Sequence, residues 1–260
     1  MYTTLEVTRD GAVTTVWMNR PEVHNAFDER LIDELTRACV ELDGDASVRV
    51  VVLGGRGRNF SAGADLNWMR RAANNSVDEN RRDARRLAEM LRVLAHMSKP
   101  TIARVQGAAL GGGTGLTAAC DMAVAARDAV FSTSEVRFGI IPSAISPYVL
   151  RAIGPRQALR YFQSAERIPA ERALAIGLVQ EVAASEELDR VVAALAAELM
   201  SGGPNALAAA KALVRDIAGR PIDAAIGEET AERIARQRAT DEAREGISAF
   251  LEKRPPNWRP

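Results

Sequence analysis

Two loops of small residues carry backbone N–H groups that could stabilise an oxyanion. The first runs from Arg58 to Leu66, and the second runs from Val105 to Leu116 and contains the triplet Gly111-Gly112-Gly113. The second loop leads directly into a helical pattern, so its free N–H groups lie at the positive end of a helix dipole. Because small residues let a ligand approach such donors closely, the two loops predict an oxyanion pocket. The triplet alone is also typical of a tight turn or a phosphate loop.

The second loop differs from two common nucleotide-binding motifs. No Gly-Lys-Ser/Thr follows the triplet, which excludes a Walker loop. The loop also lies far from the first strand-like run, where the Gly-x-Gly-x-x-Gly dinucleotide fingerprint belongs. The loop therefore matches neither nucleotide-binding motif, and an oxyanion pocket is the interpretation that we carry forward.

Strand and helix patterns alternate around these loops. Strand-like runs are expected at residues 5–8, 13–18, 48–53, 101–105, 122–125 and 129–132. Helical patterns are expected at residues 28–42, 77–97, 114–120, 170–176, 186–200, 205–217 and 222–245. The boundary signal Ser201-Gly202-Gly203-Pro204 separates the two parts. This order predicts an α/β core over residues 1–200 and a helical region over residues 201–260.

Composition limits the possible partners and surroundings. The chain has 260 residues, and its 34 basic residues balance its 34 acidic ones, so nucleic acid is not an expected partner. No apolar run approaches the ~20 residues that span a bilayer, and no signal peptide is recognised. Cys39 and Cys120 lie in helical or apolar contexts and are expected to be reduced and buried. We expect a cytoplasmic protein without a metal site or a membrane segment.

Taken together, the motifs resemble the crotonase (enoyl-CoA hydratase/isomerase) family. The resemblance rests on Asn19-Arg20-Pro21 with Asn25-Ala26, on the segments 60–66 and 106–113, and on the C-terminal segment 250–258. It covers essentially the whole chain. It implies a spiral of ββα turns followed by helices that form a homotrimer or a dimer of trimers. No cofactor is implied, because the CoA thioester is itself the substrate.

The resemblance assigns roles to particular residues. The thioester oxygen would accept hydrogen bonds from the N–H groups of Ala62 and Gly112, and removal of such a donor typically slows a reaction ~10²–10³-fold. Phe250 and Lys253 would reach CoA from a neighbouring subunit, with core packing and a solvated tail as the alternatives. Trp68 could line the acyl pocket, although core packing explains it equally well. Contacts with CoA or the acyl group are also expected from His24, Ala26, Gly63, Ala64, Asp65, Leu66, Gly111 and Ser143.

The acid–base residues depart from the family's hydratases, which carry two glutamates. The first position falls on Gly115, which has no side chain, and the second falls on Glu135. Glu135 is therefore expected to act as the acid or base, a role worth ~10²–10⁴ in rate. Apolar neighbours such as Phe138 should raise its pKa. The alternative is a surface carboxylate paired with Arg137.

The segment after Pro142 indicates a substrate class. It reads Ser143-Ala144-Ile145-Ser146-Pro147 where most members have a glycine-rich run. It looks like a bacterial branch assigned to 3-methylglutaconyl-CoA and isohexenylglutaconyl-CoA hydration, in leucine and acyclic terpene degradation. The resemblance thus implies a hydratase of branched, carboxylated 2-enoyl-CoA. The substrate carboxylate, or a water held by Ser143, would partly replace the missing glutamate.

Other reactions of the family remain open at this stage. One alternative is a Δ3,Δ2-enoyl-CoA isomerase that uses Glu135 alone. Another is a catalytically silent CoA-binding subunit, which Gly115 suggests. Decarboxylation and dehalogenation are further chemistries of the same family.

Overall fold

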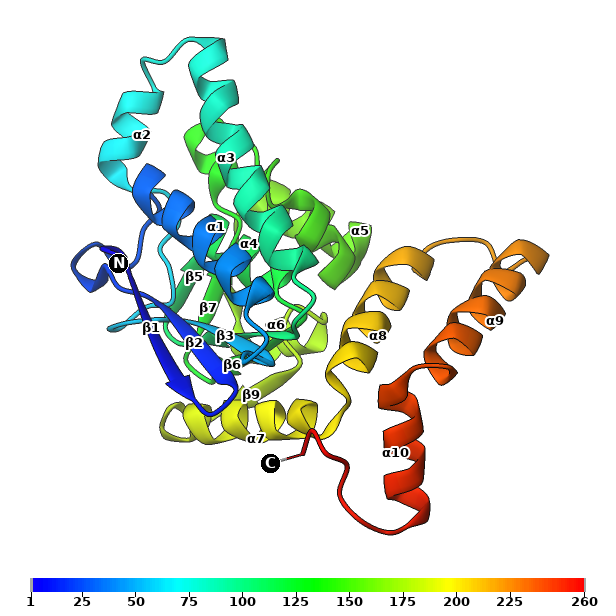
Figure 1. The fold of residues 1–260 in the computed structure, drawn as a ribbon. Helices are drawn as coiled ribbons and strands as arrows, with labels where there is room; N and C mark the ends of the chain where they lie inside the picture. Colours follow the sequence, from blue (N-terminus) through cyan, green and yellow to red (C-terminus); the bar gives the residue numbers. More distant parts are fainter. Residues whose placement is uncertain (1, 260) are drawn as a thin grey trace.

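The computed structural model describes residues 2–259 and combines two β-sheets with surrounding helices (Figure 1). The larger sheet has the strand order β1-β2-β3-β4-β6-β9, and the smaller has the order β5-β7-β8. The strands are β1 Leu5–Asp10, β2 Val13–Met18, β3 Val50–Gly55, β4 Thr101–Val105, β5 Ala108–Leu110, β6 Met122–Ala126, β7 Val130–Ser132, β8 Ile168–Pro169 and β9 Glu181–Ala183. The α-helices are α1 Glu29–Gly44, α2 Leu66–Ala72, α3 Val77–His96, α4 Gly112–Ala119, α5 Ser146–Ser164, α6 Ala170–Ala175, α7 Leu188–Ser201, α8 Pro204–Ile217, α9 Ala224–Arg238 and α10 Asp241–Leu251.

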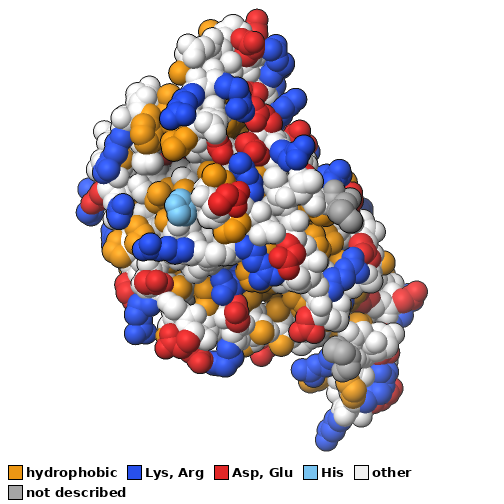
Figure 2. Space-filling view, turned by 90° about the vertical axis from the view of Figure 1, so that its left-hand side faces the viewer, with side chains coloured by type: hydrophobic (Ala, Val, Ile, Leu, Met, Phe, Trp, Pro, Cys, Tyr) orange, Lys and Arg blue, Asp and Glu red, His pale blue; other side chains and the backbone are white. Residues whose placement is uncertain are grey.

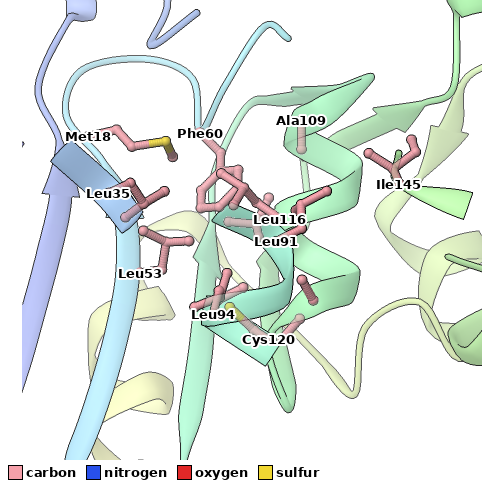
Figure 3. Packing of buried hydrophobic residues seen from close by; sticks show 14 of the residues in the cluster. Met18, Leu35, Leu53, Phe60, Leu91, Leu94, Ala109, Leu116, Cys120 and Ile145 are labelled. Carbon is pink, nitrogen blue, oxygen red and sulfur yellow. The ribbon is translucent and has the colours of Figure 1, made fainter. Parts of the chain in front are cut away.

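Alternating side chains bury both faces of the larger sheet. In β3, Val51 and Leu53 join the main core with α1, α3 and α4, whereas Val50 and Val52 pack with α7 on the opposite face. Because β2, β3, β4, β6 and β9 pair in parallel, their carboxyl ends share one edge of the sheet. The two glycine-containing loops emerge at this edge, from β3 and β4. Figure 3 shows the main core from close by.

Local signals explain where the helices begin. The Asp28 side chain accepts a hydrogen bond from Leu31 N and caps α1. Ser76 and Glu79 form a capping box at the start of α3. The predicted hairpin at Asp10-Gly11 is confirmed, and Gly11 adopts a φ of 56°, which glycine tolerates without strain. The mixed α/β fold class is likewise confirmed.

Several elements differ from the sequence-based expectations. The region predicted as one helix over residues 222–245 is two helices, α9 and α10, because Thr240 is extended and caps α10 through Ala243 N. Helix α5 is not expected from the sequence, since Gly154 and Pro155 interrupt its pattern with a kink. Strand β9 is also not expected, because it is only three residues long. Such short segments carry too little periodicity to be recognised.

The last three helices stand beside the α/β body, on the right of Figure 1. The predicted boundary at residues 200/201 falls where α7 ends and α8 begins, while the division into two units stays a prediction. Arg49 fastens this junction: its guanidinium donates to the carbonyl of Trp258 (2.7 Å) and to that of Gly202. The Trp258 indole in turn donates to Ser201 O at 3.2 Å. The C-terminal tail is thereby tied to the hinge between α7 and α8.

The molecular surface carries charges of both signs, as the balanced composition predicts. Figure 2 shows acidic and basic side chains interspersed over the face that it presents. Within residues 2–259, no single helix is both long and apolar enough to cross a membrane; only the bent pair 185–201 and 204–217, taken together, meets that criterion. Cys39 and Cys120 are buried free thiols, as expected.

Candidate active site

The two loops at the sheet edge are joined by backbone hydrogen bonds. Ser61 N donates to Ala108 O (3.0 Å), and Leu110 N donates to Ser61 O (2.9 Å), forming a short parallel bridge. The contact is close enough that a Cβ on Gly63 would lie 2.9 Å from Leu110 O. Gly63 also has a φ of 89°, so both space and conformation require glycine there. The bridge fixes one loop against the other and sets the spacing of their remaining donors.

The hydrogen bonds of the first loop correct the predicted donor. Ala62 N already donates to His24 O at 2.9 Å, so its N–H is not free to bind a ligand. The N–H groups of its neighbours Phe60, Ser61, Gly63 and Asp65 also have acceptors within the protein. Ala64 is partly exposed, and its N–H has no acceptor among the described residues. The assignment of Ala62 as the donor is therefore wrong, and the free N–H group of this loop belongs to Ala64.

The second loop presents its donor at the start of α4. Gly111 N donates to Ser132 O at 2.7 Å, whereas Gly112 is the first residue of the helix, where N–H groups lack an intrahelical partner. Gly112 is partly exposed, and a Cβ there would lie 2.3 Å from the Phe27 ring. The Phe27 ring thus supports the loop from behind. Gly112 N–H remains a candidate donor at the positive end of the helix dipole.

A buried ion pair holds the end of the first loop. Asp65 caps α2 by accepting from the N–H groups of Asn67 (2.8 Å) and Trp68 (3.3 Å), and Arg20 lies 3.2 Å away. Burial alone would raise the pKa of Asp65, but these N–H groups and Arg20 outweigh it, and the pKa is lowered. Asp65 is thus a fixed carboxylate that orients Ala64 and begins α2. Arg20 also donates to Ala26 O at 2.6 Å. Ala26, one of the residues expected to contact CoA, is thus held by the same ion-pair network.

The turn before α1 is held in an unusual conformation. His24 and Asn25 have φ values of 56° and 54°, a region that non-glycine residues seldom adopt. The fully buried Asn25 amide donates to Arg56 O (2.9 Å) and Asn59 O (2.8 Å), which stabilises this turn. The exposed His24 ring lies 3.1 Å from the Asn59 side chain. This turn affects the site because its His24 carbonyl accepts the hydrogen bond of the Ala62 N–H.

Glu135 lies directly beside the second loop. A Cβ built on Gly111 would lie 3.3 Å from Glu135 Oε1, while Glu135 Oε2 is buried and has no hydrogen-bond partner among the described residues. Burial raises the pKa of this carboxyl above its ordinary value of 4.5, and only a backbone hydrogen bond opposes the shift. Arg137, the suggested surface partner, forms no ion pair with it in the part of the chain that the structure describes. The structure thus places a desolvated carboxyl beside Gly111, the residue that precedes Gly112.

Ile145 fills the space beside Gly115. A Cβ on Gly115 would lie 2.2 Å from Ile145 Cγ2 and 2.7 Å from Ile145 Cβ, and the Ile145 side chain is buried against α4 (Figure 3). No side chain fits at position 115 unless this contact moves. Sequence reasoning missed Ile145 because the contact joins α4 to the unexpected helix α5. Glu135 therefore has no carboxyl opposite it at this position.

Three further candidates were expected to contact the acyl group or CoA. Trp68 packs on the main core, yet its indole Nε1 is buried and lacks an acceptor among the described residues. Ser143 is exposed; its N–H donates to Ile141 O and its carbonyl accepts from the Ser146 hydroxyl. Leu66 is also exposed, as a residue at the mouth of a site would be. The roles of these three side chains stay predictions.

Phe250 and Lys253 are not brought to the loops within one chain. Phe250 is 81% exposed on α10, and Figure 1 places α10 on the far side of the molecule from α2. Core packing, the alternative considered for Phe250, is therefore wrong for the single chain. Any contact of these residues with the site requires a second copy.

Comparisons with known proteins match the whole chain. The family model described as "Enoyl-CoA hydratase/isomerase" matches residues 8–260. A putative enoyl-CoA hydratase/isomerase structure from Legionella pneumophila is 43% identical, covers 98% of both chains and has a TM-score of 0.94. The crotonyl-CoA hydratase of Syntrophomonas wolfei is 34% identical, over 99% of this chain and 98% of its own. The 2,3-dehydroadipyl-CoA hydratase of Escherichia coli is also 34% identical, over 98% of each chain.

Proposed function

Because the chain belongs to the enoyl-CoA hydratase/isomerase family, we propose that it adds water to a 2-enoyl-CoA through a thioester enolate. The observation that carries this proposal is the grouping of two free backbone donors, Ala64 and Gly112, with the buried carboxyl of Glu135. Acyl-CoA is the substrate, and no separate cofactor is needed for this chemistry. Each group has a distinct task in the reaction.

The donors stabilise the charge that develops on the thioester oxygen. As the oxygen of water bonds to Cβ, the π electrons of the double bond move through the conjugated system onto the carbonyl oxygen. Ala64 N–H and Gly112 N–H point their dipoles at that oxygen, and the α4 dipole adds to the effect. Donors fixed by the backbone need no reorganisation during the reaction. Together they lower the barrier to enolate formation.

Glu135 moves the protons. In its ionised form it takes a proton from water as the C–O bond forms, and the resulting carboxyl returns a proton to Cα. The enolate then collapses to the thioester, H and OH have been added across the double bond, and Glu135 is ionised again. Its raised pKa suits this cycle, because a desolvated carboxylate is a stronger base than an exposed one. Because Ile145 fills the space beside Gly115, no second carboxyl stands there, and Glu135 carries out both proton transfers.

The acyl group is proposed to be branched and carboxylated, as in 3-methylglutaconyl-CoA. Overall sequence identity does not indicate which acyl group is the substrate. Relatives named for crotonyl-CoA and for 2,3-dehydroadipyl-CoA are equally similar to this chain. The resemblance of the segment from Ser143 to Pro147 supports the carboxylated class. Ser143 and the substrate carboxylate are proposed to position the attacking water.

Completion of the CoA site is proposed to require oligomerisation. Phe250 and Lys253 are solvent-facing residues at the end of α10, and a neighbouring copy would bring them to the CoA of the next site. A homotrimer or a dimer of trimers satisfies this requirement. His24, Ala26, Gly63 and Leu66 are proposed to form the nucleotide and pantetheine side of the same site.

Turnover of a small set of thioesters tests the function. We expect a 3-hydroxyacyl-CoA product from 2-enoyl-CoA, and a higher kcat/KM for 3-methylglutaconyl-CoA than for crotonyl-CoA. Equal values would contradict the carboxylated class. Conversion of a 3-enoyl-CoA to its 2-enoyl isomer, without hydration, would instead establish the isomerase that one carboxyl also permits. CoA binding without any turnover would indicate a silent subunit.

A further inference from the structure

Phe27 contacts both of the loops that carry the proposed oxyanion donors. Its backbone pairs with the first loop: Phe27 N donates to Gly63 O (2.7 Å), and Asp65 N donates to Phe27 O (2.8 Å). These two bonds flank Ala64, which forms a parallel bridge with Phe27. Because the bonds of such a bridge come from the residues on either side, the N–H of Ala64 itself points away from Phe27. Phe27 therefore sets the position and the direction of the first donor.

The Phe27 side chain packs against the second loop. A Cβ built on Gly112 would lie 2.3 Å from Phe27 Cε2 and 2.8 Å from Phe27 Cδ2, so the flat ring lies directly against the Gly112 backbone. Phe27 is 1% exposed and belongs to the main core, where close packing leaves the ring little freedom. The ring thus fixes the place where α4 begins, and with it the position of the second donor.

Arg20 holds the residues on either side of Phe27. Its guanidinium donates to Ala26 O (2.6 Å) and lies 3.0 Å from Asp28 Oδ2 and 3.2 Å from Asp65 Oδ2. Asp28 is also the N-cap of α1. Phe27 therefore belongs to a short segment that is anchored at both ends, so its ring is a fixed support for Gly112.

The other contact between the two loops lies further from the donors. Ser61 and Ala109 form a parallel bridge, and each lies three residues before the donor of its own loop, Ala64 or Gly112. That bridge holds the bases of the loops together. Phe27 is different because it contacts the two donor residues themselves, one through its backbone and the other through its ring.

We infer that Phe27 is a positioning residue that sets the separation of the Ala64 and Gly112 N–H groups. This inference rests on the proposed hydratase function and identifies the side chain that shapes its oxyanion pocket. Two donors bind one oxygen well only at a fixed spacing, and a misplacement of about 1 Å can slow a reaction on the order of 100-fold. Loss of the ring lets the start of α4 shift, while the first loop stays bonded to the Phe27 backbone.

Phe27→Leu tests this role with a ligand that reports on the thioester oxygen. The ligand is 3-methylglutaryl-CoA labelled with ¹³C at the thioester carbonyl, the saturated counterpart of the proposed substrate. In wild type the signal of the bound carbonyl should move downfield, because the donors draw electron density toward the oxygen. In Phe27→Leu this shift should be smaller, and exchange of an α proton in D₂O should slow about tenfold to a hundredfold. The thioester concentration that gives half-maximal exchange should change little.

Leu42→Ala is the matched control for a loss of core packing. Leu42 belongs to the same core near the far end of α1, and the two substitutions remove the same number of carbon atoms. The control should lose stability in urea, yet keep the carbonyl shift and the exchange rate of wild type. If Phe27→Leu does not fold, Phe27→Met takes its place, since methionine fills irregular core spaces and also lacks the ring.

The carbonyl signal separates positioning from a merely structural role. A Phe27 variant that keeps the wild-type carbonyl shift, whatever its exchange rate, would overturn the inference. An equal loss of the shift in Leu42→Ala would overturn it as well. Wild-type protein that shows neither a shift nor exchange would instead refute the proposed function.

Discussion

At the scale of single residues, Glu135 combines a disadvantage for folding with an advantage for catalysis. Its Oε2 is buried without a partner among the described residues, and burial raises its pKa. Ionisation in this place is unfavourable, yet an ionised, poorly solvated carboxylate is the base that the proposed water addition requires. Sites of this kind commonly trade stability for activity.

Glu135→Gln should therefore stabilise the protein near neutral pH. A folded-state pKa above the unfolded value gives stability that is present below the unfolded pKa and is lost as pH rises through the folded pKa. The glutamine amide does not ionise and avoids that loss, so the thermal midpoint of the variant should exceed wild type by a few degrees at pH 7. Thermal unfolding at pH 7 and near pH 4 measures this. An equal difference at both pH values would contradict the account.

The Ala62 assignment shows where residue-scale prediction fails. The motif from Phe60 to Leu66 identifies the loop, but the spacing of residues cannot tell which N–H is already bonded. His24 O takes the Ala62 N–H, and this contact depends on the unusual backbone of a distant turn. Glu135, by contrast, is predicted from its spacing and lies beside Gly111 as that prediction requires.

At the scale of elements, the packing of α4 against the start of α5 decides which side chains fit opposite Glu135. Ile145 stands immediately before α5 and occupies the space that a side chain at Gly115 would need. The glycine and the isoleucine are thus a complementary pair. As the two residues are packed, a carboxyl-bearing side chain at position 115 would not fit.

Gly115→Ala should destabilise the protein by ~1–3 kcal/mol, because overpacking a buried contact forces backbone or rotamer shifts. Ile145→Ala removes the Cγ2 atom that the new Cβ would meet at 2.2 Å. The double variant should therefore lose less stability than the sum of the two single changes. Urea unfolding of the single and double variants measures this coupling.

Gly227→Ala is the matched control for this prediction. A Cβ at Gly227, inside α9, would meet no atom within 4 Å, so alanine should stabilise the helix by ~0.5–1 kcal/mol. Strictly additive effects of Gly115→Ala and Ile145→Ala would show that the two residues do not compete for the same space.

Elements with strong local signals can be predicted from the sequence, and short or interrupted ones cannot. Helix α3 has a capping box at its start and buried apolar residues, Met90, Leu91 and Leu94, near its end, and its prediction agrees with the structure almost to the residue. Strand β9 is three residues long, and the break at Thr240 depends on one hydrogen bond. The loops are recognisable, but their mutual contact at Ser61 arises only when β3 and β4 pair in the sheet.

At the scale of the whole molecule, the C-terminal helices leave apolar surface uncovered. Val214, Ile222, Phe250 and Leu251 are each at least 70% exposed, which is unusual for large apolar side chains in one region. A cavity of about 730 Å³ also lies between α8 and the body, lined in part by Pro100, Ala118, Met122, Tyr148, Leu207 and Val214. These features support the proposed oligomer.

Light scattering should therefore give a particle of three or six 28.0 kDa chains. Phe250→Ser should raise KM for the CoA thioester more than it lowers kcat, because Phe250 is proposed to contact CoA across the interface rather than the reacting atoms. Steady-state kinetics of an assembled variant measure this. A fully active monomer would contradict the proposal.

The central claim is that Glu135 exchanges a proton with Cα of a thioester whose oxygen is held by Ala64 and Gly112. Incubation of a saturated acyl-CoA in D₂O tests this step directly, because it needs neither water addition nor a double bond. Mass spectrometry should show deuterium entering one of the two α positions with wild type, and a rate ~10²–10⁴ lower with Glu135→Gln. Absence of exchange with wild type, or equal exchange with both proteins, would contradict the account.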